Sequence, residues 1–264
     1  MKFYHNKKKQ PLVYVWRILF FLVIVFGLSF LAYHYRNILS EKKEIKRAEE
    51  SVKNIPKIEE PKEKTVDVTP VAEVSDVLSK SALIKMPFTT QSPLAIWDAV
   101  QEDACEEASI IMVVHYLNKT SIGTKNEAEK EILDLVSYET ANNYGPSITL
   151  KDLNKIAKSY YSLTGTVKTG ISVDDIKKEI SLGNPVIVPA AGKILPNPNF
   201  RNGGPNYHML VVKGYDENGF ITNDPGTRLG ENFRYTFDAL YKAIHDWDQN
   251  NIFNGPKTYL ILNK

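Results

Sequence analysis

The chain has 264 residues, of which 33 are Lys or Arg and 31 are Asp or Glu, and its formal net charge is +2 at pH 7. So small a net charge argues against a nucleic-acid-binding protein, which needs a marked excess of basic residues on one face. The sequence contains a single cysteine, Cys105, no zinc-type spacing of Cys and His, and no glycine-rich phosphate loop. We therefore expect no metal and no cofactor.

The first predicted element is a transmembrane signal anchor at residues 18–36, preceded by a cytoplasmic segment at residues 1–17. Residues 18–35 are almost entirely apolar, and about 20 such residues are enough to cross a bilayer. The positive-inside rule places the N-terminus in the cytoplasm, because five basic residues precede the apolar run: Lys2, Lys7, Lys8, Lys9 and Arg17. We therefore expect a single-pass protein of the cell membrane whose C-terminal domain faces outward. A cleaved signal peptide is the alternative, but the run exceeds the usual apolar core and no Ala-x-Ala cleavage site closes it.

Residues 37–80 are predicted to form a charged, flexible stalk. They are rich in Lys and Glu, include Pro56, Pro61 and Pro70, and contain no aromatic residue after position 40. Such a composition buries too little apolar surface to offset the entropy lost on ordering.

Residues 81–264 are predicted to form one domain, because aromatic and β-branched residues return there and about 180 residues suffice for a hydrophobic core. The predicted fold class is α+β, with helices first and the strands of an antiparallel sheet later. The apolar patterns and capping signals predict helices beginning at Asp103 and covering about 124–138, 149–162, 172–183 and 236–247. Capping boxes are predicted at the starts of two of them, Thr124 with Glu127 and Ser172 with Asp175. Strands are predicted at 185–189, 208–213, 220–224 and 258–262.

Cys105 lies where an irregular stretch becomes an apolar helix. Asp103 and Glu106 have the spacing of a capping box, which would place Cys105 in the first turn beside unpaired backbone N–H groups. These groups and the helix dipole favour the thiolate of a nucleophilic cysteine. A lone cysteine outside the cell is also unusual unless it is reactive. The opposing interpretation is a buried structural cysteine, and the carboxylates of Glu106 and Glu107 would raise the pKa of the thiol.

His208 and Asp224 follow on adjacent predicted strands, in the order that a papain-like thiol hydrolase needs. If the connecting loop spans residues 214–218, the two residues lie directly opposite each other on one face. If Asn218 and Gly219 instead form a two-residue turn, the side chains point to opposite faces, because an odd shift in register reverses the face. Both registers remain open at this point.

The stretch at residues 192–207, just before His208, contains three prolines and three glycines. Structureless loops of this length are uncommon unless they are functional, so it is either a connector or a lid that faces the substrate. His115 and His245 are interpreted as core-edge and surface histidines, not as catalytic residues.

Three segments resemble a known family: residues 87–109, 208–216 and 223–227. They are similar to domains related to the bacteriocin-processing peptidases, which cleave double-glycine leaders and belong to the papain-like cysteine peptidase superfamily. The resemblance covers about residues 84–264 and implies a papain-like fold.

The resemblance also implies roles for individual residues. Cys105 would be the nucleophile, His208 the general base and later acid, and Asp224 the residue that orients the imidazole. Family members place a Gln before the cysteine as an oxyanion donor. Gln91 matches the family context but lies 14 residues upstream, whereas Gln101 is only four residues away; we prefer Gln91.

The leading interpretation is a membrane-anchored, extracytoplasmic cysteine peptidase or amidase that acts on a peptide or protein substrate. The competing interpretation is a catalytically inactive domain that binds peptides or envelope proteins. It is favoured by the two glutamates after Cys105, because many relatives have Gly-Pro there. Cell-wall amidase activity would differ from the leading interpretation in its substrate alone.

Overall fold

The computed structural model describes Gly27 and residues 78–264. The predicted cytoplasmic segment, the membrane anchor apart from Gly27, and nearly all of the stalk therefore lie outside the described residues. Within the described part of the chain, no helix combines the length and the apolar character needed to cross a membrane. The account that follows concerns residues 78–264.

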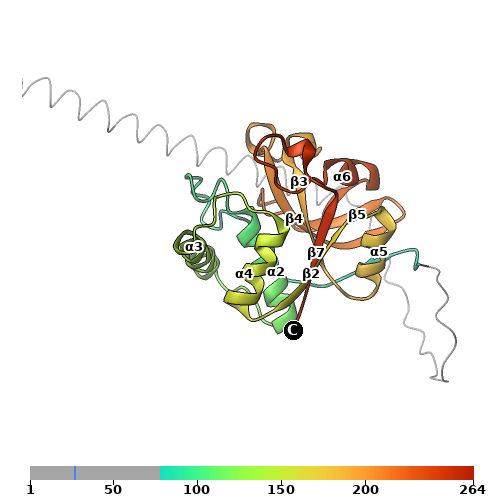
Figure 1. Cartoon of the computed structure of the whole chain (residues 1–264), viewed down its shortest axis with the longest axis horizontal. Coiled ribbons are helices and arrows are strands. Elements are labelled where there is room, and N and C mark those ends of the chain that lie inside the picture. The colour runs from blue at the N-terminus through green and yellow to red at the C-terminus, as the bar shows by residue number, and fades with distance from the viewer. Residues whose placement is uncertain (1–26, 28–77) are drawn as a thin grey trace, which may run out of the picture. The chain divides into compact units, whose positions relative to one another are not determined.

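Helices come first in this region and most strands come later, as the sequence predicts (Figure 1). The helices are α2 (Cys105–Asn118), α3 (Lys125–Ala141), α4 (Leu150–Tyr161), α5 (Val173–Ser181) and α6 (Phe237–Ala243). The strands are β1 (Ala82–Leu83), β2 (Thr164–Thr169), β3 (Val186–Ala191), β4 (Tyr207–Asp216), β5 (Gly219–Asn223), β6 (Phe233–Tyr235) and β7 (Thr258–Asn263). Short 3-10 turns lie at Gly192–Ile194, Arg201–Gly203 and Ile252–Asn254. Sequence analysis missed β1, β2 and β6, and α6 ends four residues earlier than expected.

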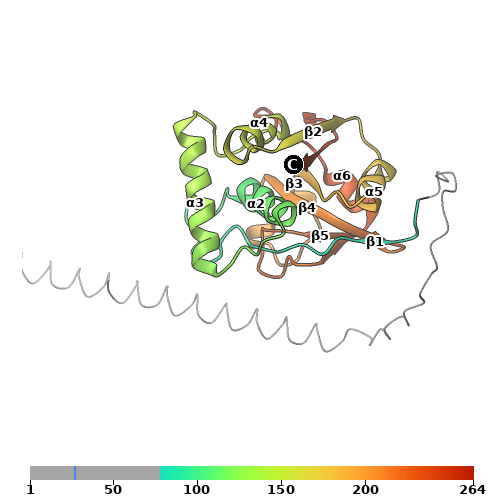
Figure 2. The ribbon, with the colours of Figure 1, turned by 90° about the horizontal axis from the view of Figure 1, so that it is seen from below.

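The strands form one sheet in the order β2-β7-β3-β4-β5-β6, with β1 also paired to β4, and every pair is antiparallel. Helices α2, α3 and α4 gather on one side of the molecule, and α2 lies between α3 and the sheet (Figure 2). The remaining helices, α5 and α6, lie on the other side (Figure 1). The predicted α+β class with an antiparallel sheet is confirmed.

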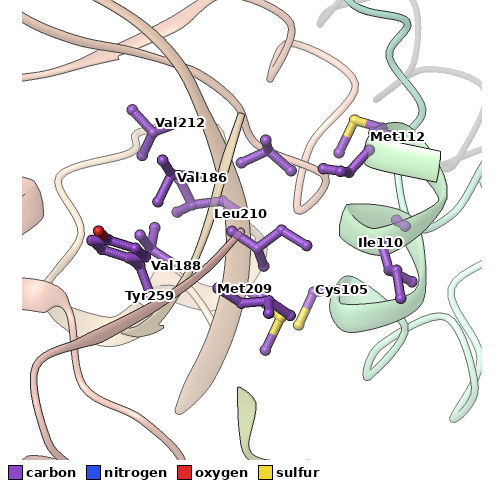
Figure 3. Close-up of a cluster of buried hydrophobic side chains, with 14 of the residues drawn as sticks. Cys105, Ile110, Met112, Val186, Val188, Met209, Leu210, Val212 and Tyr259 are labelled. Atoms are coloured by element: carbon purple, nitrogen blue, oxygen red, sulfur yellow. The ribbon is translucent and has the colours of Figure 1, made fainter. Parts of the chain in front are cut away.

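Helix α2 is the central element of the core, because its first ten residues are all buried. Cys105 and Ile110 on this helix face Met209 and Leu210 on β4 (Figure 3). A helix apolar on nearly all sides is expected where both faces are covered. This packing holds the only cysteine against the strand that carries His208.

The predicted capping box at the start of α2 is wrong. Ala104 is the N-cap and no side chain caps the helix, while Asp103 is exposed and Glu106 is buried. The side chain of Glu106 turns inward to other partners because α2 is covered on both sides. The boxes predicted at the starts of α3 and α5 are confirmed, at Thr124 and Ser172.

The β4–β5 hairpin resolves the register that the sequence left open. Asp216 pairs with Gly219, so the turn differs from both expected turns, and the pairing then shifts by one residue at Lys213. Without this bulge, His208 and Asp224 would point to opposite faces of the sheet, because side chains alternate along a strand. The extra residue shifts the alternation of side chains by one position and thereby brings both side chains to one face.

We expect residues 78–264 to fold without the preceding segment. The buried side chains of these residues form one hydrophobic core, and starting at 78 keeps the hydrogen bonds between Ser79 and Tyr215. The purified fragment should unfold in a single cooperative thermal transition within a few degrees of the full chain. A broad transition, or aggregation at low temperature, would contradict this.

Candidate active site

His208 and Asp224 form a hydrogen bond of 2.8 Å between Nε2 and Oδ1, and both side chains are fully shielded from water. His208 lies near the start of β4, and Asp224 directly follows β5. Burial by itself would raise the pKa of Asp224. The neighbouring His208 and the hydrogen bonds from His208, Tyr235 and Gly226 outweigh burial, so this pKa lies below its ordinary value. The carboxylate therefore stays charged at neutral pH.

Asp224 is held by more groups than the sequence indicated. The Tyr235 hydroxyl donates to Oδ2 at 2.6 Å, the Asn197 amide donates to the same oxygen at 3.1 Å, and the Gly226 N–H donates to Oδ1 at 3.0 Å. Asn197 also donates to the Tyr235 hydroxyl. No motif marks Asn197 or Tyr235, because they come from a loop and from a short strand that sequence analysis missed. Both oxygens of the carboxylate are thereby fixed, which sets the orientation of the imidazole.

Cys105 begins α2, is 3% exposed and donates its thiol hydrogen to Glu106 Oε2 at 2.9 Å. Burial, followed by the charge and hydrogen bond of Glu106 and the charge of Glu107, raises the pKa of the thiol well above its ordinary value. A backbone hydrogen bond at Met209 acts in the opposite direction but is weaker. Sequence reasoning expected a lowered pKa for this thiol, and the structure shows a raised one. Desolvation and the nearby carboxylates raise the pKa by more than the N-terminus of the helix lowers it.

Glu106 is itself an unusual group. Burial raises the pKa of its carboxyl to about 8, and its other oxygen accepts a hydrogen bond from the Ile148 N–H at 3.4 Å. At neutral pH most of this carboxyl is protonated, so it carries little charge. As the pH rises above 8 it ionises and then opposes the ionisation of Cys105.

The thiol of Cys105 and the imidazole of His208 are not hydrogen-bonded to each other. His208 Nδ1 is buried and has no hydrogen-bond partner in the described part of the chain. A backbone hydrogen bond from Met209, the next residue along β4, nevertheless reaches the Cys105 sulfur. The side chains of the two residues lie side by side (Figure 3). Cys105 thus contacts the residue that follows His208, and the ring nitrogen of His208 that does not meet Asp224 has no partner among the described residues.

The two candidate oxyanion donors have different environments. Gln91 is buried and donates from Nε2 to the carbonyl oxygens of Gln101 and Glu102, at 2.8 and 3.2 Å, in the turn that leads into α2. Gln101 instead directs its amide at Glu129 on α3, at 2.5 Å. This geometry favours Gln91, because its amide already lies beside the backbone that precedes Cys105.

A pocket of about 230 Å³ opens beside the His208–Asp224 pair. Phe200 lines it and packs edge-on against the His208 ring, with 5.1 Å between centroids. The Arg201 guanidinium lies 5.1 Å from the ring centroid of Trp97, across the pocket. The lining residues are Gln91, Trp97, Glu102, Lys193, Phe200, Arg201, Asn202, Gly204, Pro205 and Gly226. Residues 192–207 therefore form one wall of this pocket.

The two remaining histidines of this region have other partners. His115 contacts Thr120 and Glu131, and His245 contacts the carbonyl oxygen of Gly255. No group of three or more His, Cys, Asp or Glu side chains within the described residues has the arrangement of a metal site.

Comparison with known proteins adds family information to this geometry. The model of a family described as the Peptidase_C39-like family matches residues 83–251. The crystal structure of a C39-like peptidase from Bacillus anthracis is similar, with a TM-score of 0.48 and 18% sequence identity, over 70% of this chain and 98% of that one. No curated protein matches the sequence.

We expect Glu106→Gln to lower the pKa of the Cys105 thiol. The amide keeps an oxygen for the Ile148 N–H but removes the negative charge that Glu106 carries at the high pH where the thiol titrates. The rate of alkylation by iodoacetamide, measured from pH 6 to 11, should rise at lower pH in this variant than in the unmodified protein. Glu102→Gln, an exposed change three residues before the cysteine, is the matched control. Identical profiles for Glu106→Gln and the unmodified protein would contradict this assignment.

Proposed function

Because the chain belongs to the Peptidase_C39-like family, we propose that it is a cysteine peptidase or amidase that hydrolyses a peptide or amide bond through Cys105, His208 and Asp224. The observation that carries the proposal is the fully buried His208–Asp224 pair. Nδ1 of its imidazole has no hydrogen-bond partner among the described residues, and His208 lies on the strand that contacts the cysteine sulfur. A buried polar atom without a partner calls for an explanation. The Cys105 thiol provides that explanation if it turns toward His208 Nδ1 in the working state.

The reaction then follows from the chemistry of these groups. The Cys105 thiol leaves Glu106 and gives its proton to His208 Nδ1, and the thiolate attacks the substrate carbonyl carbon. His208 returns the proton to the leaving amine, and a water molecule activated by the same imidazole hydrolyses the thioester. Asp224 stays ionised, holds Nε2–H and stabilises the imidazolium. Imidazolium close to the sulfur also counteracts the burial that raises the pKa of the thiol.

The oxyanion formed during attack requires donors at the start of α2. The backbone N–H of Cys105 and the side-chain amide of Gln91 are the candidates. Gln91 now donates to two backbone carbonyls, so it supplies a donor to substrate by exchanging one of these contacts. Mutation of Gln91 is therefore expected to lower kcat more than it raises KM.

A catalytically inactive peptide-binding domain is the second candidate. The raised pKa of Cys105 and the contact between its thiol and Glu106 favour it. Turnover and its dependence on His208 separate the two candidates, since a binding domain needs neither.

We expect Cys105→Ala and His208→Ala each to lower kcat/KM by at least about 10³-fold, because nucleophile and base act as a unit. Asp224→Asn should cost less, since the amide still accepts a hydrogen bond from the ring. His115→Ala and His245→Ala, whose side chains have other partners, should retain full activity. Cleavage of a proteome-derived peptide mixture, followed by mass spectrometry, measures this. Cleavage that survives Cys105→Ala, or no cleavage by the unmodified chain, would favour the binding domain.

We also propose that the protein is anchored in the cell membrane by residues 18–36, with residues 81–264 outside the cytoplasm. The support is the apolar run and the basic residues before it, because such a run inserts with its basic flank inside. Protease added to intact spheroplasts should digest the C-terminal domain, and alkaline carbonate should leave the chain in the membrane fraction. Protection of the domain in intact spheroplasts, or a mature N-terminus near residue 33, would overturn this topology.

A further inference from the structure

A second pocket, of about 190 Å³, lies on the α3 side of the turn that leads into Cys105. Its walls come from the turn before α2, from α2 itself, from the C-terminal half of α3 and from the segment that follows α3. The lining residues are Ala99, Val100, Asp103, Glu107, Val136, Glu139, Thr140, Tyr144, Gly145 and Pro146. Several of these are exposed, among them Ala99, Asp103 and Gly145, so the pocket opens to solvent.

Two buried carboxyl groups line this pocket. Glu107 is 4% exposed and Glu139 is 5% exposed. Their side chains are hydrogen-bonded to each other, and two carboxyl groups can share such a bond only when a proton lies between them. Apart from this contact, neither Glu107 Oε2 nor Glu139 Oε1 receives a hydrogen bond from any described residue. Buried carboxylates are ordinarily paired with a cation or with several donors. Within the described residues this pair has no cation among the groups lining its pocket, and Glu107 has one backbone hydrogen bond besides the bond that the pair shares.

All the ionisable side chains that line the pocket, apart from Tyr144, are carboxyl groups. Asp103 adds a third carboxyl at its opening, and no Lys, Arg or His is among its lining residues. Burial and mutual repulsion raise the pKa of Glu107 well above its usual value, and burial raises that of Glu139. A bound cation would relieve both effects, because an opposite charge at close range favours the ionised carboxylate.

The shape and lining of the pocket select the kind of cation. The described carboxyl groups do not have the arrangement of a metal site. Val136, Tyr144 and Pro146 provide apolar walls above the two glutamates. Such walls suit a long aliphatic stem that carries its charge at the tip, as Lys and Arg side chains do.

We propose that this pocket, called here the acidic pocket, binds a lysine or arginine side chain of the substrate. The inference rests on the proposed peptidase function. Asp103 and Glu107 lie two positions before and after Cys105, so the pocket and the cysteine share the start of α2, with Glu107 directed at Glu139 on α3 and the sulfur directed at β4. A peptide that crosses this end of the helix places its basic side chain in the pocket on one side and its backbone beside the thiol on the other. The cation displaces the proton that Glu107 and Glu139 share, and that proton goes to solvent. The bound state is then one cation facing two carboxylates.

Binding can be measured without turnover. The full chain carrying Cys105→Ala is titrated by calorimetry with a blocked tripeptide that has a central lysine, and with the same peptide carrying norleucine. We expect the lysine peptide to bind at least about tenfold more tightly, since a charged hydrogen bond contributes that much or more. An arginine peptide should likewise exceed its citrulline counterpart. Equal affinities within both pairs would overturn the proposal.

Variants locate the site. Adding Glu139→Gln keeps a hydrogen-bonding side chain beside Glu107 but removes a charge, and should abolish the preference for lysine over norleucine. Asp134→Asn, on the exposed surface of the same helix, should leave the preference unchanged. A preference that survives both Glu139→Gln and Glu107→Gln would overturn the assignment to this pocket. If Glu139→Gln does not fold, Glu107→Gln decides the outcome.

The peptide mixture separates this inference from the peptidase proposal. Cleavage that depends on Cys105 but shows no enrichment of Lys or Arg near the cleaved bond would refute the acidic pocket and leave the peptidase function intact. Tight binding of the lysine peptide without any cleavage would support the pocket and refute the peptidase function.

Discussion

The hydrogen bond between His208 and Asp224 joins two ionisable side chains that are both fully removed from water. Removing one partner from such a pair leaves an uncompensated buried charge, which typically costs about 3–5 kcal/mol. The surrounding structure is arranged to avoid that state. Tyr235, Asn197 and the Gly226 N–H satisfy the oxygens of Asp224. Short strand β6 and the loop before β4 thereby acquire a role beyond packing, because each contributes one of these donors.

The position of this pair depends on a local irregularity in the sheet. The bulge at Lys213 changes the parity of the β4–β5 pairing and places His208 and Asp224 on one face. Phe200 then covers the His208 ring from the preceding loop. The site is therefore built from a regular hairpin, one extra residue and one long loop. Bulges next to functional sites commonly re-aim a side chain in this way.

Carboxyl groups dominate the electrostatics on the other side of the site. The start of α2 provides backbone N–H groups that favour anions, but Glu106 lies against the thiol, and Glu107 meets Glu139 on α3. Burial raises the pKa values of all three carboxyl groups, that of Glu106 to about 8. The thiol and Glu106 share one hydrogen bond, and Glu107 and Glu139 share another. A cationic substrate would favour the ionised carboxylates of Glu107 and Glu139, and an imidazolium would favour the thiolate of Cys105.

Much about this protein follows from the sequence by itself. The α+β class, the confirmed capping boxes at Thr124 and Ser172, and the order of Cys105, His208 and Asp224 depend on local patterns and on residue types along the chain. The family resemblance also rests on those residues. Only the tertiary structure decided the rest. Whether Glu106 caps a helix or enters the core depends on what covers α2, and whether His208 meets Asp224 depends on one bulged residue. Burial and strand register arise from contacts between distant segments, and these contacts set the pKa values and the facing of side chains.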